Sequence, residues 1–272
     1  MTRLIMKETT MGAGISRRGF LYDLGRGTLA LAVLGLAACS DPGETPDTIA
    51  TTSTTGETNP PPPASQETTP PQAPTAGALS WHRVNLGFVS AYILVRGGEA
   101  AIVDTGVENS ESDIEAGLIS LGLDWSAVGH VILTHRHGDH QGSLPAVLAA
   151  AAGATAYAGA GDLTAITSPR PLVSVGDGDK VFDLEIIETP GHTPGHISVL
   201  SPEAGLLIAG DALNGNNGGV TGANPQFSPD MATANLSVKK LAGYHFETVV
   251  FGHGEPVEGN AAGLVAELAA TL

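Results

Sequence analysis

The 272-residue chain has a single cysteine and few basic residues, and each scarcity excludes a class of protein. With only Cys39 present, no intramolecular disulfide can form, so the stability of the folded part must come from its hydrophobic core. Lys and Arg number 12 against 28 Asp and Glu, which gives a formal net charge of −16 at pH 7. So acidic a chain offers no basic surface to neutralise phosphates, which argues against a nucleic-acid partner and favours small neutral or cationic substrates.

Residues 1–39 have the features of a processing segment and not of a folded domain. Basic residues precede the apolar run GTLALAVLGLAAC, which is too short to span a membrane and ends in small residues. Within it, SRRGFL at 16–21 resembles a twin-arginine export motif, and LAAC at 36–39 resembles a bacterial lipobox, whose cysteine is lipidated. An ordinary secretory signal, which needs positive charge and no motif, is the alternative. Met11 is an alternative start to Met1, because the intervening residues add nothing that the signal needs.

These signals predict export and anchoring to the outer face of the bacterial cell membrane, or in the periplasmic or cell-wall zone, through lipidated Cys39. The twin-arginine translocase is then the partner during export, and the lipid anchor is the only membrane contact. Residues 40–78 contain ten Thr and nine Pro, with no aromatic residue, Lys or Arg. Such a segment cannot bury enough apolar surface to fold, so we expect a disordered linker.

Residues 79–272 are long enough for one domain with a sizeable core, and they hold all nine histidines. Runs of β-branched and apolar residues alternate with helical patterns, which predicts a layered α/β domain. Strands are expected at 81–86, 91–96, 100–104, 131–134, 155–157, 183–188, 197–200, 206–209 and 248–251. Helices are expected at 110–121, 143–152, 229–241 and 260–270.

The stretch ILTHRHGDHQG at 132–142 gathers four potential metal ligands within six positions, His135, His137, Asp139 and His140. Side chains alternate along an extended segment, so His135, His137 and Asp139 are expected to project from one side while His140 turns in from the next element. Neutral imidazole and carboxylate are the usual ligands of zinc and other divalent transition metals. The cluster therefore predicts a metal site, against the alternative of a polar surface loop.

Three later stretches can complete such a site. TPGHTPGH at 189–196 offers His192 and His196, LLIAGDAL at 206–213 ends a strand with Asp211, and VVFGHGEP at 249–256 ends another with His253. Each places a potential ligand at the end of a strand beside glycine, where little side-chain bulk obstructs a bound ion.

Together, and in this order, these stretches resemble the metallo-β-lactamase fold superfamily, and its glyoxalase II-like and lactonase-like branches most closely. The resemblance covers essentially all of residues 79–272. It includes VDTG at 103–106, THRHGDH at 134–140, GHT at 191–193, GD at 210–211 and GH at 252–253. It implies a single catalytic domain with an αββα sandwich fold and two metals in a cleft along one edge.

The same resemblance implies a role for each side chain. The first metal would be held by His135, His137 and His192, the second by Asp139, His140 and His253, and Asp211 would bridge them. Asp104 resembles the buried aspartate that supports the ligand loop, and His196 would belong to the outer shell. Zinc is the first expectation for both ions, with iron or manganese as alternatives, because twin-arginine export carries a domain out with its metals already chosen.

The expected function is hydrolysis of an ester, thioester, lactone or lactam bond in a small molecule. A hydroxide bridging the two metals would attack, with Asp139 orienting it and later carrying a proton towards the leaving group. Asp211 stands where one β-lactamase subclass has cysteine. The 19 residues after His253 leave no room for the helical domain with which true glyoxalase II binds glutathione.

Two other functions remain open at this point. One is oxidation by a mononuclear iron variant of the fold, similar to the persulfide dioxygenases; the presence of Asp139, His140 and His253 counts against it. The other is a non-catalytic metal-binding lipoprotein, against which the intact ligand set counts.

Several residues outside these motifs could contact the substrate or support the fold. The Asn- and Gly-rich loop at 214–229 is a candidate substrate-facing loop, in which Asn216 and Asn217 could contact the substrate. Tyr244 could line the cleft, although packing is the commoner role for a tyrosine before a strand. The remaining histidines have no motif partners and are expected to be structural or on the surface: His82, His130 and His245.

Overall fold

The computed structural model describes residues 77–272. The export signal, the lipid attachment at Cys39 and nearly all of the predicted linker at 40–78 lie outside these residues. Within them, no helix combines the length and the apolar character needed to cross a membrane.

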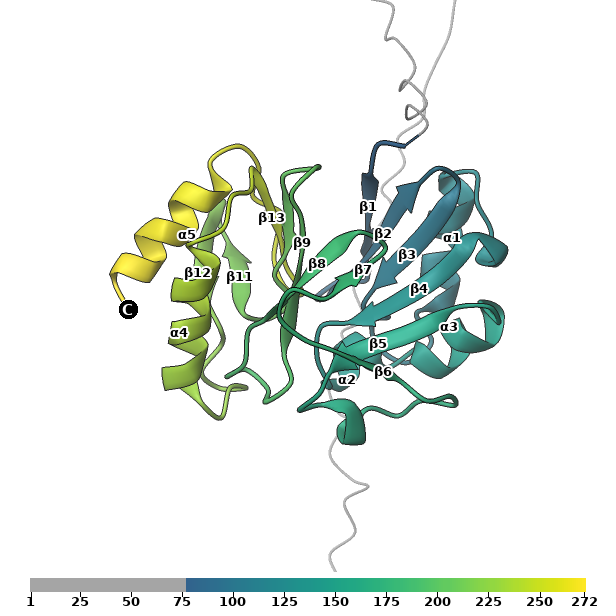
Figure 1. The fold of residues 1–272 in the computed structure, drawn as a ribbon, viewed down its shortest axis with the longest axis horizontal. Coiled ribbons are helices and arrows are strands. Elements are labelled where there is room, and N and C mark those ends of the chain that lie inside the picture. Colours follow the sequence, from purple (N-terminus) through teal and green to yellow (C-terminus); the bar gives the residue numbers. More distant parts are fainter. Residues whose placement is uncertain (1–76) are drawn as a thin grey trace, which may run out of the picture. The chain divides into compact units, whose positions relative to one another are not determined.

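Two mixed sheets form the centre of the domain (Figure 1). The first sheet runs in the order β1 (Ser80–Asn85), β2 (Ser90–Arg96), β3 (Glu99–Val103), β4 (Val128–Leu133), β5 (Thr155–Gly159) and β6 (Val173–Val175). The second runs in the order β13 (Thr248–Val250), β10 (Leu206–Ile208), β9 (Ile197–Ser201), β8 (Leu184–Glu188) and β7 (Lys180–Val181). A separate hairpin is formed by β11 (Leu213–Asn216) and β12 (Gly219–Gly222).

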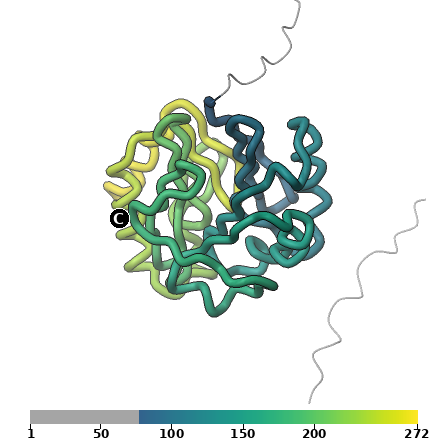
Figure 2. Tube along the Cα trace, turned by 45° about the vertical axis from the view of Figure 1, so that its right-hand side comes forward, coloured from purple at the N-terminus to yellow at the C-terminus, as the bar shows by residue number. Residues whose placement is uncertain are grey.

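Helices cover the outer face of each sheet, which gives four layers. On the first sheet lie α1 (Glu111–Ser120) and α3 (Leu144–Ala150), and on the second lie α4 (Met231–Leu241) and α5 (Ala261–Ala270). Figure 2 shows the same arrangement turned, with the earlier half of the described chain packed against the later half. The structure is therefore an αββα sandwich, as the resemblance implies.

The strand β2, with the sequence SAYILVR, shows how the layers follow from the sequence. Successive side chains point to opposite faces of a sheet, and all but the last residue of β2 are buried. Ile93 and Ala91 join the core under α1, whereas Tyr92 and Leu94 join the core between the two sheets. A strand buried on both faces reads as a continuous apolar run, which is why its position was predictable.

The structure contains every predicted strand and helix, with ends shifted by up to three residues. The short strands β6 and β7 were not predicted, because three and two residues carry no periodicity. The prediction of a loop at 214–229 was wrong for its first part, which belongs to the β11–β12 hairpin. Asn217 (φ 49°) and Gly218 (φ 79°) both have positive φ at the turn, as a tight hairpin requires.

Candidate metal centre

The ends of five strands bring the predicted site residues together. Asp104 follows β3, the 135–140 segment follows β4, His192 follows β8, Asp211 follows β10 and His253 follows β13. These strands come from both sheets, and the residues that follow their C-terminal ends meet along one edge of the sandwich. Residues that are up to 149 positions apart in the sequence, Asp104 to His253, are thus placed in one cluster.

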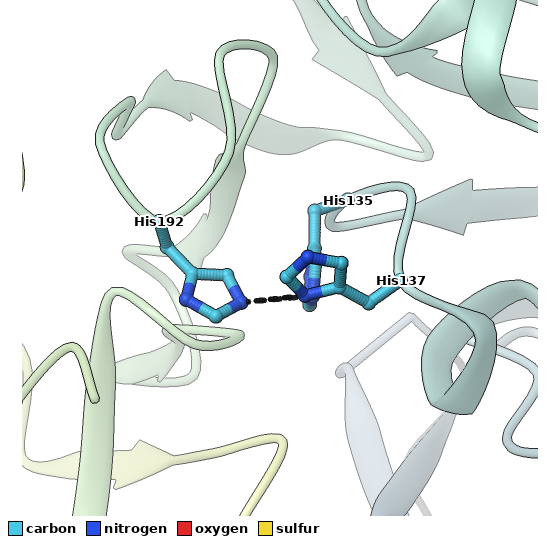
Figure 3. Close-up of side chains that lie close together, drawn as sticks. All are labelled: His135, His137 and His192. Atoms are coloured by element: carbon cyan, nitrogen blue, oxygen red, sulfur yellow. Dashed lines mark hydrogen bonds between the residues drawn. The ribbon is translucent and has the colours of Figure 1, made fainter. Parts of the chain in front are cut away.

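Three histidines form the first half of this cluster (Figure 3). His192 Nε2 lies 2.9 Å from His137 Nδ1 and 3.2 Å from His135 Nε2, and His135 Nε2 lies 3.1 Å from His137 Nδ1. Figure 3 shows the ring of His192 facing the other two from the opposite side. Two nitrogens bound tetrahedrally at about 2.0–2.1 Å from one ion lie about 3.4 Å apart, close to these separations.

The second half of the cluster consists of Asp139, His140 and His253. His253 Nε2 lies 3.3 Å from Asp139 Oδ2, and His140 Nε2 lies 3.9 Å from the same oxygen. Asp211 reaches both halves, because its Oδ2 lies 3.4 Å from His192 Nε2 and 3.4 Å from His253 Nε2. All seven residues that were predicted as metal ligands therefore lie together, and a third possible ligand group, His135, His140 and Asp211, joins the two halves.

The expected geometry of the 135–140 segment needs a correction. His137 has extended backbone angles (φ −68°, ψ 147°), but the chain then enters the short helix α2 (Gly138–Gln141). Asp139 and His140 are thus presented from a helical turn, and Asp139 does not alternate along an extended segment with His135 and His137. The turn directs Asp139 and His140 towards His253, while His140 also lies beside His135, with ring centroids 4.1 Å apart.

Hydrogen bonds fix the tautomers of four of the histidines. His140 Nδ1 donates to Asp104 Oδ2 (2.8 Å), and His253 Nδ1 donates to the carbonyl oxygen of Phe88 (2.7 Å). His135 Nδ1 faces the hydroxyl of Thr134 (3.1 Å), which has already donated its proton to Asp104. With Nδ1 protonated, Nε2 of each ring carries its lone pair into the cluster, as a metal ligand must.

His192 is oriented in the same way from a different part of the chain. Its Nδ1 lies 2.9 Å from the hydroxyl of Ser228, and that hydroxyl donates to the carbonyl oxygen of Asn224 at 2.7 Å. Ser228 must therefore accept from His192, which leaves Nε2 free to bind. Ser228 was not singled out from the sequence, because a serine 36 positions from its partner gives no local signal.

Charge in the cluster is unbalanced in a way that suits cations. Burial lowers the pKa of His135 well below 6.5 and that of His192 to about 4, so both rings are neutral at pH 7. Burial also acts against protonation of His140, but the carboxylates of Asp211 and Asp104 outweigh it and raise its pKa well above 6.5. The negative field that would protonate Nε2 of His140 would equally hold a metal ion there.

Two buried polar atoms of the cluster test whether these residues fit metal ions. His140 Nε2 and Asp211 Oδ1 face each other at 3.3 Å, and neither atom has another partner, although buried polar groups are nearly always satisfied in folded proteins. Between them and the neighbouring backbone the packing is close, since a Cβ at Gly252 would overlap both Asp211 Oδ1 and the ring of His140. A buried imidazole nitrogen and a carboxylate oxygen that converge with no other partner are what a bound cation requires, and the residues fit.

His196 lies beside the ligand cluster but has other partners. Its Nε2 accepts a hydrogen bond from the backbone N–H of Asp211 (2.9 Å), and its Nδ1 lies 2.8 Å from the hydroxyl of Thr189. Both ring nitrogens are therefore used, and burial lowers its pKa to about 3. His196 positions the backbone of Asp211 and offers no free lone pair to an ion.

Asp162 is a further residue of the site that sequence reasoning missed. Its fully buried carboxylate accepts hydrogen bonds from the backbone N–H of Arg136 (3.0 Å), the hydroxyl of Thr193 (2.6 Å) and the backbone N–H of Gly195 (3.0 Å). Arg136 lies between two of the predicted ligands, and Thr193 follows a third. Asp162 thus ties the two ligand-bearing loops together. Its partners are mainly backbone groups, which no sequence pattern reveals.

Outside the cluster lie the asparagines of the hairpin, Tyr244 and two of the histidines without motif partners. His130 contacts the hydroxyl of Tyr157 (3.2 Å), and His245 is exposed on the surface. Tyr244 packs against the core under α4 and α5 and does not line the cleft. Asn216 and Asn217 are exposed at the hairpin turn.

A cavity of about 500 Å³ opens onto the cluster. Five of the seven predicted ligands line it, together with Gly138, Asn214, Asn224, Phe88 and Phe227. A molecule in this cavity would contact the residues of both halves of the cluster, so the cavity is the candidate substrate site.

Comparison with known proteins identifies the family of the chain. The sequence model of the metallo-beta-lactamase superfamily matches residues 84–253, which include all seven predicted ligands. A hydroxyacylglutathione hydrolase of Cereibacter sphaeroides is 30% identical over 171 residues, which are 60% of this chain and 60% of that protein. The probable metallo-hydrolase YflN of Bacillus subtilis is 39% identical over 84 residues. These are 27% of this chain and 32% of YflN, so the chain spans less than two thirds of either relative.

Solved structures share the fold. The metallo-beta-lactamase family protein TTHA1429 from Thermus thermophilus superimposes with a TM-score of 0.58 at 23% identity, covering 71% of this chain and 79% of that one. TTHA1623, solved in a di-iron-bound form, superimposes with a TM-score of 0.56 at 26% identity, covering 68% of this chain and 95% of that one.

Proposed function

This chain belongs to the metallo-beta-lactamase superfamily, and we propose that it is a hydrolase that holds two divalent metal ions and cleaves an ester, thioester, lactone or lactam bond. The observation that carries the proposal is the pair of ligand groups that share Asp211. The names of the relatives, a hydroxyacylglutathione hydrolase and a protein in a di-iron-bound form, support hydrolysis and two ions.

In this proposal, His135, His137 and His192 hold the first ion, Asp139, His140 and His253 hold the second, and Asp211 contacts both. Zinc is the first candidate for both ions, because imidazole and carboxylate suit it, while the same donors also suit iron and manganese. Two such ions would supply a hydroxide nucleophile near neutral pH and polarise the oxygen of the bond under attack.

The residues of the chain then have separate tasks. Asp139 lines the cavity, with Oδ2 of its carboxylate 3.3 Å from His253 Nε2, and a carboxylate at this place can accept a proton. Because it faces the cavity, Asp139 can orient the attacking group and later pass a proton to the leaving group. Asp104 and Ser228 keep His140 and His192 in the binding tautomer.

Hydrolysis of a panel of chromogenic esters, thioesters, lactones and a cephalosporin tests the proposed activity. The His137→Ala variant is the matched inactive form, because it removes one ligand of the first ion that also faces the cavity. Turnover of one class by the wild type, lost in His137→Ala, is the expected result. Absence of turnover on every class, with one iron per chain, would instead favour oxygen-dependent sulfur chemistry.

The proposal includes export and anchoring through Cys39, which rest on the N-terminal sequence alone. A Cys39→Ser variant should move from the membrane fraction to the soluble fraction of the producing cell, with the lipid label lost. An Arg17→Lys, Arg18→Lys double variant should remain unexported if the twin-arginine translocase is the route.

A further inference from the structure

Two aromatic side chains line the cavity together with the predicted metal ligands. Phe88, in the turn between β1 and β2, and Phe227, after the β11–β12 hairpin, both line the cavity, with 64% and 58% of their surface exposed. Large aromatic side chains with this much exposed surface lose a contact with water when a ligand covers them. Both rings are thus available to an apolar part of a substrate.

Each of the two phenylalanine rings lies next to a residue of a different half of the metal cluster or next to its support. Phe88 stacks on His253, with ring centroids 6.0 Å apart and planes 10° apart, and its carbonyl oxygen holds His253 Nδ1. Phe227 adjoins Ser228, whose hydroxyl orients His192. Because Phe88 supplies the carbonyl oxygen that holds His253, and Phe227 precedes the serine that orients His192, the apolar walls stand close to the reacting centre.

Among the described residues, no Lys or Arg lines this cavity. The two arginines near it in sequence are already paired: Arg136 is directed at Asp162, with Nη1 3.9 Å from its Oδ1, and Arg83 forms an ion pair with Glu255. The other polar groups of the wall are the neutral amides of Asn214 and Asn224. A carboxylate carried by a substrate away from the bond to be cleaved would find no cation, in a chain of net charge −16.

We infer that the substrate is an uncharged ester, thioester, lactone or lactam whose apolar group is held between Phe88 and Phe227, and that substrates bearing a remote carboxylate are rejected. The inference rests on the proposed hydrolytic function and names its substrate class. It separates this site from one built for glutathione thioesters or β-lactam antibiotics, because both of those carry carboxylates.

A matched pair of esters tests the inference directly. 4-Nitrophenyl pentanoate and mono-4-nitrophenyl glutarate have acyl chains of the same length that end in a methyl group and a carboxylate, respectively. The expected kcat/KM is at least about tenfold higher for the pentanoate, because the carboxylate of the glutarate ester would lose water at an apolar wall without a cation to pair with. An equal or higher value for the glutarate ester would overturn the inference.

Single variants locate the effect. Phe227→Ala should raise KM for the pentanoate about fivefold more than it raises KM for 4-nitrophenyl acetate. Phe227→Lys should shift the preference towards the glutarate ester, because it places a cation in the wall. Ile119→Ala, which removes a side chain of similar exposure (65%) on α1, is the control. Equal effects of Ile119→Ala and Phe227→Ala would contradict the inference.

A binding measurement keeps the inference testable if no ester is hydrolysed. 1-Pentanethiol and 5-mercaptopentanoate can both bind a metal ion through sulfur, and they differ at the far end in the same way as the two esters. Binding to the cobalt-substituted protein, followed by absorbance, should be at least about tenfold tighter for the neutral thiol and should weaken in Phe227→Ala. Tighter binding of 5-mercaptopentanoate would overturn the substrate class, whereas failure of hydrolysis alone would count only against the proposed function.

Discussion

The carboxylate of Asp104 and Nδ1 of His140 lie 2.8 Å apart, and both side chains are buried. The same carboxylate also accepts hydrogen bonds from Thr134, which in turn faces His135. Asp104 has a positive φ of 62°, a conformation that aspartate adopts more readily than most residues. One side chain thus orients a predicted ligand from each half of the cluster.

Asp104→Asn is therefore expected to weaken the binding of both metal ions about 10- to 100-fold, because an amide cannot accept from His140 and Thr134 as a carboxylate does. Competition with a chromophoric chelator measures this. Asp124→Asn changes an exposed aspartate that caps Ser126 far from the cluster, and is the control. Unaltered affinity in Asp104→Asn would show that the orientation of these histidines does not depend on Asp104.

Ser228→Ala is expected to act on one ion only. Ser228 contacts His192 of the first half and none of Asp139, His140 and His253. Removal of its hydroxyl should reduce the affinity of the first ion by about tenfold and leave that of the second unchanged. Stepwise metal titration by calorimetry resolves the two affinities, and an equal loss at both steps would contradict the assignment.

Asp162→Asn is expected to lower the free energy of unfolding of the metal-free protein by about 1–3 kcal/mol. The NH2 group of the new side chain would face another donor, the backbone N–H of either Arg136 or Gly195. The site is buried, so no water could relieve this contact. Urea unfolding in the presence of a chelator gives the value. Glu203→Gln, which removes a surface partner of Arg96, should change it by less than about 1 kcal/mol.

The stability of the metal-free protein is expected to be highest near pH 6.5. Burial lowers the pKa of His192 to about 4 and that of His196 to about 3. Between pH 6.5 and 4 the unfolded chain therefore takes up protons that the folded protein does not, so the free energy of unfolding decreases as the pH is lowered. Hydrogen bonds to Asp139 and Asp211 raise the pKa of His253 to about 10, so its contribution is full below pH 6.5 and is lost as the pH rises towards 10. Urea midpoints at three pH values measure the curve, and a midpoint that still rises at pH 9 would contradict it.

The sequence predicted both the fold class and the residues that gather at the ends of five strands. Ligand types such as those of His135, His137 and Asp139 stand in one short stretch, and His192, Asp211 and His253 each stand beside glycine at a strand end, so residue type and position both carry information. Long buried strands such as β2 were also visible as apolar runs.

What could not be predicted depends on contacts between residues that are far apart in the sequence. Asp162 and Ser228 are bound to partners 26 and 36 positions away, and nothing in their local sequence marks them. The β11–β12 hairpin did have a local signal, because NNGG at 216–219 favours a turn with two positive φ values. The surrounding Gly and Asn content concealed it, because such composition is equally typical of a loop.

The number of metal ions bound per chain tests the central claim most directly. Elemental analysis of the purified wild type should give two ions per chain, with His192→Ala and His253→Ala each retaining one and Asp211→Ala retaining neither, because Asp211 is the carboxylate proposed to contact both ions. One ion per chain in the wild type, unchanged in His253→Ala, would contradict a dinuclear centre.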